Sequence, residues 1–164
     1  MLFRSFPLHQ APVNRRRPLR IDMSDSLSIA QLIDHALLHP TMTDQEIREG
    51  CELAARLGVK SVCVKPYAVP LAVDTLKGTR TLVGTVIGFP HGSQPTQIKV
   101  AEAEWALAAG AVELDMVVNI GKVLQGDWEF VRRDIEAVAQ AAHRQGALLK
   151  VIFETDYEIG RAHV

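Results

Sequence analysis

Residues 112–119 read Val-Glu-Leu-Asp-Met-Val-Val-Asn, and residues 148–154 read Leu-Leu-Lys-Val-Ile-Phe-Glu. Both stretches are short, apolar and rich in β-branched residues, which is typical of buried strands. Because side chains alternate between the two faces of a strand, Glu113 and Asp115 share one face, and Lys150 lies on the polar face of the second stretch. The opposite faces are apolar. This one-sided placement predicts strands that pack on helices through one face and gather charges on the other.

Working outward from these stretches, short β-branched segments alternate with helical patterns between residues 28 and 153. This alternation is typical of repeated βα units around a parallel sheet, so the sequence predicts an α/β fold. The predicted strands are residues 35–38, 61–64, 81–87, 112–118 and 148–153. The predicted helices run from a Thr43–Glu46 capping box to Gly58, from Pro66 to Gly78, from 96 to 109 and from 128 to about 145.

The two ends of the chain do not fit this alternation. Residues 1–22 contain five arginines and three prolines and have no apolar periodicity. We interpret them as a disordered leader or as non-native sequence upstream of a true start at Met23, with a targeting peptide or a nucleic-acid-binding arm as alternatives. Residues 158–164 carry no amphipathic pattern, and we interpret them as a non-native tail. The predicted domain is therefore residues 23–157.

Composition indicates one globular domain and excludes several classes of partner. The 164 residues have a formal net charge of −1, so no overall charge favours nucleic acid or an anionic membrane. No apolar run approaches the roughly 20 residues of a membrane-spanning helix. Cys51 and Cys63 have neither the number nor the spacing of a disulfide framework or zinc site, and they suit a reducing compartment. We expect a cytoplasmic protein that binds neither membrane nor nucleic acid.

Known sequence motifs for nucleotides, metals and serine nucleophiles are absent. The sequence has no Gly-x-Gly-x-x-Gly, no P-loop, no Gly-x-Ser-x-Gly and no His-Glu-x-x-His. The spacing of His35, His39 and His91 does not suggest a metal site either. Dinucleotide, NTP-hydrolysing, serine-hydrolase and zinc-protease functions therefore lose support.

Asp115 and Lys150 are the residues that could carry chemistry. If their strand faces point into a barrel, neither could be buried unpaired, so they should pair with each other or with neighbours. Such a pair suits proton transfer, but it is equally suited to satisfying the interior as a structural ion pair, and spacing leaves both interpretations open. By residue type alone, Cys63 is a small core residue and Asp34 a turn or cap residue.

The Gly88–Gly92 turn, Gly-Phe-Pro-His-Gly, follows a predicted strand. In barrels, active sites lie at this end of the strands. Two glycines and a proline also form a turn without any functional reason. The turn is therefore a candidate part of a site and not a site by itself.

Five stretches lie at the five predicted strands: Ile-Asp-His-Ala-Leu-Leu (33–38), Ser-Val-Cys-Val-Lys-Pro (61–66), Gly-Thr-Val-Ile-Gly-Phe-Pro-His-Gly (84–92), Glu-Leu-Asp-Met-Val-Val-Asn-Ile-Gly (113–121) and Lys-Val-Ile-Phe-Glu-Thr (150–155). Together and in this order, they resemble the deoxyribose-phosphate aldolase family over residues 28–157. The resemblance implies a TIM (β/α)8 barrel, here only about its first five βα units. It also implies reversible cleavage of 2-deoxy-D-ribose 5-phosphate to acetaldehyde and D-glyceraldehyde 3-phosphate through a lysine Schiff base, with no metal or cofactor.

By the same resemblance, Asp115 matches the family's proton donor and acceptor, and Lys150, Asp34 and Cys63 match supporting positions in the same cavity. Ala36 departs from a threonine often found there, which alters a polar contact and not the chemistry. The family's imine-forming lysine lies on the sixth strand, a second lysine on the seventh, and the phosphate-binding backbone in the last loops. None of these has a counterpart here, and Lys150 matches a different position.

We therefore predict a C-terminally truncated aldolase chain that is itself inactive. Its full-length parent would act on a small phosphorylated sugar, and a homo-oligomer is among its expected states. Two alternatives stay open: another phosphate-handling TIM-barrel enzyme, such as an isomerase or synthase, and a non-catalytic half-barrel that pairs with a partner chain.

Overall fold

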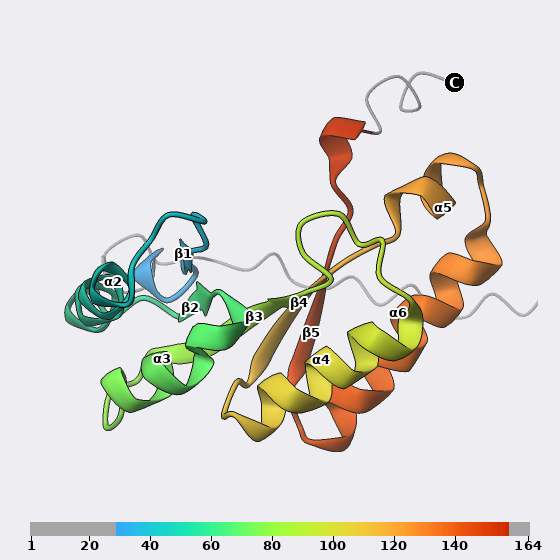
Figure 1. Ribbon diagram of the computed structural model, residues 1–164. Coiled ribbons are helices and arrows are strands. Elements are labelled where there is room, and N and C mark those ends of the chain that lie inside the picture. The colour runs from blue at the N-terminus through green and yellow to red at the C-terminus, as the bar shows by residue number, and fades with distance from the viewer. Residues whose placement is uncertain (1–28, 158–164) are drawn as a thin grey trace, which may run out of the picture.

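The computed structural model describes residues 29–157, which form one curved parallel sheet with helices packed along its outer face (Figure 1). The spatial order of the strands is β1-β2-β3-β4-β5, the same as their order in the chain, and every neighbouring pair is parallel. The strands are β1 Asp34–Leu37, β2 Ser61–Val64, β3 Leu82–Ile87, β4 Glu113–Val117 and β5 Leu148–Ile152. All five predicted strands are confirmed. Most of their ends are shifted by one residue from the predicted boundary.

Helical segments join consecutive strands. They are α2 Asp44–Leu57, the 3₁₀ turn η1 Pro66–Ala68, α3 Val69–Thr75, α4 Thr96–Ala108, α5 Ile120–Leu124, α6 Trp128–Arg144 and, after β5, the 3₁₀ turn η2 Thr155–Tyr157. The predicted capping box is present at the start of α2: Glu46 N–H donates to Thr43 Oγ1, and Thr43 N–H donates to Glu46 Oε2 at 2.7 Å. This helix ends at Gly58, whose φ of 66° is left-handed.

Two helical predictions needed correction. The second predicted helix begins as η1 and ends at Thr75 instead of continuing to Gly78. The short helix α5 was missed because Asn119 looked like the end of a strand, whereas its side chain caps the new helix by accepting from Lys122 N–H at 3.2 Å. Short capped turns of this kind carry too few residues to show a helical period.

The core lies between the sheet and its helices. Leu114 and Met116 of β4 are fully buried there, together with Ile47 of α2 and Val138 of α6. The apolar strand faces therefore contact helices, as the alternation predicted. Phe153 is an exception: it belongs to the predicted strand 148–153 but lies beyond the end of β5 and is 54 % exposed.

The sheet is strongly curled. In a flat sheet, β1 and β5 would lie about 19 Å apart, because neighbouring strands are spaced by about 4.8 Å. Lys150 Nζ on β5 nevertheless lies 2.6 Å from Asp34 Oδ2 on β1, which these two side chains could not achieve across a flat sheet. The inner face is therefore concave, as part of a barrel wall is.

Replacing Leu114 with alanine tests the placement of the core. Leu114 is 0 % exposed, so Leu114→Ala should lower the free energy of unfolding by about 2–5 kcal/mol. Leu57→Ala is the matched control, because Leu57 is 59 % exposed and its truncation should cost about 0.5 kcal/mol or less. Urea unfolding of both variants gives the comparison, and equal losses would contradict the assigned core.

Candidate active site

The polar side chains of the inner face meet around one ammonium group. Lys150 Nζ lies 2.6 Å from Asp34 Oδ2, 3.2 Å from Asp115 Oδ1 and 3.6 Å from Glu113 Oε2. Cys63 of β2 is 3 % exposed and lies close enough for the charges of Asp115 and Asp34 to act on it. The structure thus brings together the four residues that the sequence analysis selected, with Glu113 as an additional member.

Asp115 occupies a position that disfavours its charged form. Burial raises the pKa of its carboxyl group, and the charge of Asp34 raises it further, while the ammonium of Lys150 lowers it without cancelling the effect of burial. The net pKa is above the ordinary value of 3.8. Lys150 Nζ contacts the Oδ1 atom of this carboxyl group as an ion pair at 3.2 Å.

Lys150 has the opposite tendency. Its partial burial works against the charge, but the hydrogen bond to Asp34 and the negative charge of Asp115 prevail and raise the pKa of the ammonium above its usual range. Asp34 and Asp115 thus stabilise the protonated form of Lys150. A permanently protonated lysine can hold an acid in place, but it is a poor nucleophile.

Cys63 is equally unsuited to nucleophilic attack. Burial raises the pKa of its thiol well above the usual range, and the charges of Asp115 and Asp34 add to that effect. The interpretation of Cys63 as a small buried residue is therefore favoured over a reactive thiol.

Asp34 differs from its residue-based interpretation as a turn or cap. It is the first residue of β1, and its carboxylate binds Lys150 across the concave face. Glu113 was placed on the polar face of its strand but not in the site. Its sequence signal was the two-residue spacing from Asp115, whereas its contact with Lys150 depends on the register of β4 and β5.

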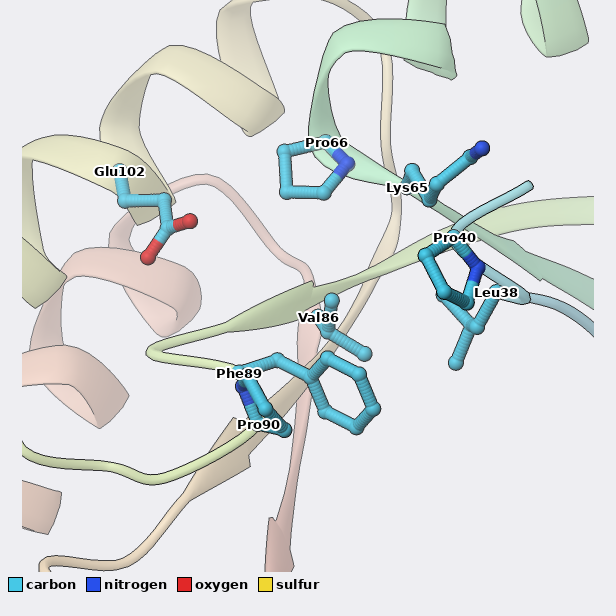
Figure 2. Close-up of a pocket in the computed structure, with 8 residues that line it drawn as sticks. All are labelled: Leu38, Pro40, Lys65, Pro66, Val86, Phe89, Pro90 and Glu102. Atoms are coloured by element: carbon cyan, nitrogen blue, oxygen red, sulfur yellow. The ribbon is translucent and has the colours of Figure 1, made fainter. Parts of the chain in front are cut away.

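A cavity of about 320 Å³ lies near the C-terminal ends of β1, β2 and β3 (Figure 2). Its lining residues come from the ends of β1, β2 and β3, from the turn after β3 and from α4. They are Leu38, Pro40, Lys65, Pro66, Val86, Phe89, Pro90 and Glu102. The lining includes none of the cluster residues, and the link between the two is Val86, which is the register partner of Asp115 on the neighbouring strand. The sequence analysis identified the turn but not the cavity, because the lining residues are mostly ordinary apolar side chains.

No metal centre is found in the described part of the chain. His, Cys, Asp and Glu side chains between residues 29 and 157 form no group of three or more that could hold a metal ion. His39 instead forms a hydrogen bond between its Nδ1 and Thr41 Oγ1 at 2.8 Å. Within the same range, no helix is long and apolar enough to cross a membrane.

Comparison with known proteins fits this geometry. The family model described as DeoC/LacD family aldolase matches residues 28–157. The chain belongs to the DeoC/LacD aldolase family. A deoxyribose-phosphate aldolase from Thermococcus gammatolerans is 49 % identical over 133 residues, which are 80 % of this chain and 59 % of the relative. One from Rhodopirellula baltica is 45 % identical over 79 % of this chain and 54 % of the relative.

Solved structures show the same similarity. A crystal structure of a putative deoxyribose-phosphate aldolase from Coccidioides immitis superposes with a TM-score of 0.76 at 44 % identity, covering 80 % of this chain and 51 % of that one. A deoxyribose phosphate aldolase from Aeropyrum pernix, described as tetrameric, gives a TM-score of 0.74 at 30 % identity over 82 % and 56 % of the two chains. The fold of this aldolase-family chain is a partial TIM barrel, and the chain spans about half to three fifths of these relatives.

Removing the central ammonium tests the electrostatics of the site. In Lys150→Met, burial still raises the pKa of Asp115 but the opposing charge is gone, so this pKa should rise further above 3.8. Carbon-13 NMR titration of the Asp115 carboxyl group measures the shift. Because this folded-state pKa exceeds the unfolded one, the Asp115 contribution to stability is lost as pH rises through the folded pKa.

Lys122→Met is the matched control, because Lys122 pairs with Asp127 at 2.8 Å on a different part of the chain. The control should leave the pKa of Asp115 unchanged. An unchanged or lowered pKa in Lys150→Met would refute the assigned contact.

Proposed function

We propose that the complete protein is a deoxyribose-phosphate aldolase that cleaves 2-deoxy-D-ribose 5-phosphate reversibly to acetaldehyde and D-glyceraldehyde 3-phosphate, and that residues 29–157 supply the part of its site that handles protons. Membership of the aldolase family supports the reaction class. The observation that carries the proposal is the partly buried Asp115 carboxyl group, which has a raised pKa and lies 3.2 Å from the Lys150 ammonium.

This carboxyl group suits proton transfer during cleavage. When the C–C bond of the imine intermediate breaks, the substrate hydroxyl must lose a proton, and the enamine that forms must later gain one on carbon. A carboxyl group with a raised pKa can accept and return a proton more readily near neutral pH than an ordinary aspartate can. Asp115 is therefore our candidate general acid and base, and Lys150, Asp34 and Cys63 are its supporting residues.

None of the chain's six lysines is placed to form the imine. Lys150 is held protonated by Asp34 and Asp115, whereas imine formation needs a neutral amine. Lys99 is buried in an ion pair, Lys65 donates to the carbonyl oxygens of His39 and Met42, and Lys122 pairs with Asp127. The remaining two, Lys60 and Lys77, do not line the cavity. These placements support an imine-forming lysine on strands absent from this chain.

The cavity agrees with a small substrate. Its volume of about 320 Å³ lies at the lower end of the usual range for ligand pockets, as a pentose phosphate requires. Its apolar lining offers Phe89 and Val86 to the carbon chain of the sugar. Lys65 is the one cation of the lining, and its ammonium already donates to the carbonyl oxygens of His39 and Met42, so we assign the phosphate to another part of the barrel. The tetrameric relative supports a homo-oligomer, and a cytoplasmic location stays a prediction.

Borohydride trapping tests this proposal. With acetaldehyde present, the complete protein should form a stable adduct detected by mass spectrometry, and the 164-residue chain should form none. In the complete protein, Asp115→Asn should lower kcat by about 100- to 10,000-fold, because it removes the proton-transferring group while leaving the lysine. Product formation is measured as acetaldehyde release.

Asp127→Asn is the matched control, since this partly exposed carboxylate lies outside the site and its change should leave kcat unaltered. An adduct on the 164-residue chain would refute its predicted inactivity. Failure of the complete protein to trap acetaldehyde or to cleave the sugar phosphate would refute the aldolase function and favour another barrel enzyme or a non-catalytic module.

A further inference from the structure

A buried ion pair lies on the helix side of the sheet, and the proposed chemistry does not use it. Lys99 of α4 is 0 % exposed, and its Nζ donates to Asp134 Oδ2 of α6 at 2.7 Å. The other oxygen of Asp134 accepts from Thr96 Oγ1 at 2.7 Å. Lys99 Nζ also donates to the carbonyl oxygen of Val117 at 3.0 Å. The network therefore joins two outer helices to the last residue of β4.

The same helix supports the turn after β3. Lys99 passes so close to Gly88 that a Cβ atom there would stand 3.0 Å from its Cε. Glu102 accepts a hydrogen bond from Gly88 N–H at 2.8 Å. At the other end of the turn, a Cβ on Gly92 would lie 1.9 Å from the carbonyl oxygen of Val118, so the turn rests directly on the chain that follows β4. Side chains of α4 thus contact both the Gly88–Gly92 turn and the end of β4.

Stability alone does not explain this placement of charges. Burying an ammonium and a carboxylate carries a desolvation cost that their attraction barely returns, and well-packed apolar residues are often as stable in such positions. An apolar side chain could not, however, donate to Val117. This carbonyl lies beyond the last register pair of β3 and β4, Ile87 with Met116, where the sheet offers no further pairing between them.

We propose that the Lys99–Asp134 pair is a positioning device, which fixes the end of β4 and the Gly88–Gly92 turn and thereby sets Asp115 relative to the substrate cavity. Val117 follows Asp115 by two residues on the same strand, and Phe89 of the turn lines the cavity. The inference rests on the proposed function. Lys99 is a positioning residue, because it acts through β4 and the turn and not on the substrate.

The test uses the complete protein with Lys99→Met and Asp134→Leu together, which removes both charges and leaves neither unpaired. The double variant should stay folded, with Tm within about 5 °C of the unaltered protein. Its kcat should fall on the order of 10- to 100-fold, because a small misplacement of a catalytic group has effects of this size. The acid limb of its pH–rate profile should also move, which a purely structural role would not cause.

Arg132→Met with Glu136→Leu is the matched control. This pair has the same 2.7 Å separation and lies on the same helix as Asp134, but it is exposed. The control should leave both kcat and the pH profile unchanged. A folded Lys99→Met/Asp134→Leu protein with unaltered kcat and an unaltered acid limb would overturn the proposal.

Two further measurements keep the outcome decisive. If the double variant does not fold, Thr96→Val removes the hydroxyl that donates to Asp134 Oδ1 and should lower kcat about tenfold, and unchanged kcat would overturn the proposal. If the unaltered complete protein has no aldolase activity, the proposed function fails separately. The positioning role of the Lys99–Asp134 pair is then tested by the pKa of Asp115, measured by carbon-13 NMR. This pKa should shift in the double variant and not in the control, and an unshifted pKa would overturn the positioning role.

Discussion

The contact between Lys150 and Asp34 is the constraint on which the rest of the structure depends. These residues stand on opposite edges of a five-stranded sheet and are 116 positions apart, yet their charged atoms lie 2.6 Å from each other. Only a curled sheet allows this approach, and curling also makes the inner face concave. The same ammonium then meets Asp115 and Glu113, so one side chain joins the first, fourth and fifth strands.

This concentration of charge determines what each group can do. The hydrogen bond to Asp34 and the negative charge of Asp115 favour the charged form of Lys150, while burial disfavours the charged form of Asp115. In the proposed reaction, Lys150 would therefore be the fixed cation and Asp115 the acid that exchanges its proton. On the outer side, Lys99 and Asp134 form a second buried pair, which holds the end of the strand that carries Asp115. Charged side chains on both faces of the sheet thus contact β4: Lys150 contacts Asp115 on the inner face, and Lys99 contacts the Val117 carbonyl on the outer side.

The fold and the central site could be predicted from the sequence because their signals are local or repeated. Alternation within β4 and β5 placed Asp115 and Lys150 on one face, and caps such as Thr43 marked the helix ends. The contact of Asp34 with Lys150 depends on sheet curvature, and that of Lys99 with Asp134 on how two helices pack; neither leaves a pattern in the sequence. The predictions for residues 1–22 and 158–164 lie outside the described residues.

A double-mutant cycle tests the curled sheet most directly, because two side chains couple energetically only where they are in contact. Urea unfolding of Asp34→Asn, Lys150→Met and the variant with both changes should give an interaction energy of at least about 0.5 kcal/mol, since Asp34 Oδ2 and Lys150 Nζ lie 2.6 Å apart. Losses of stability that simply add in the double variant would contradict the concave inner face and the site built on it.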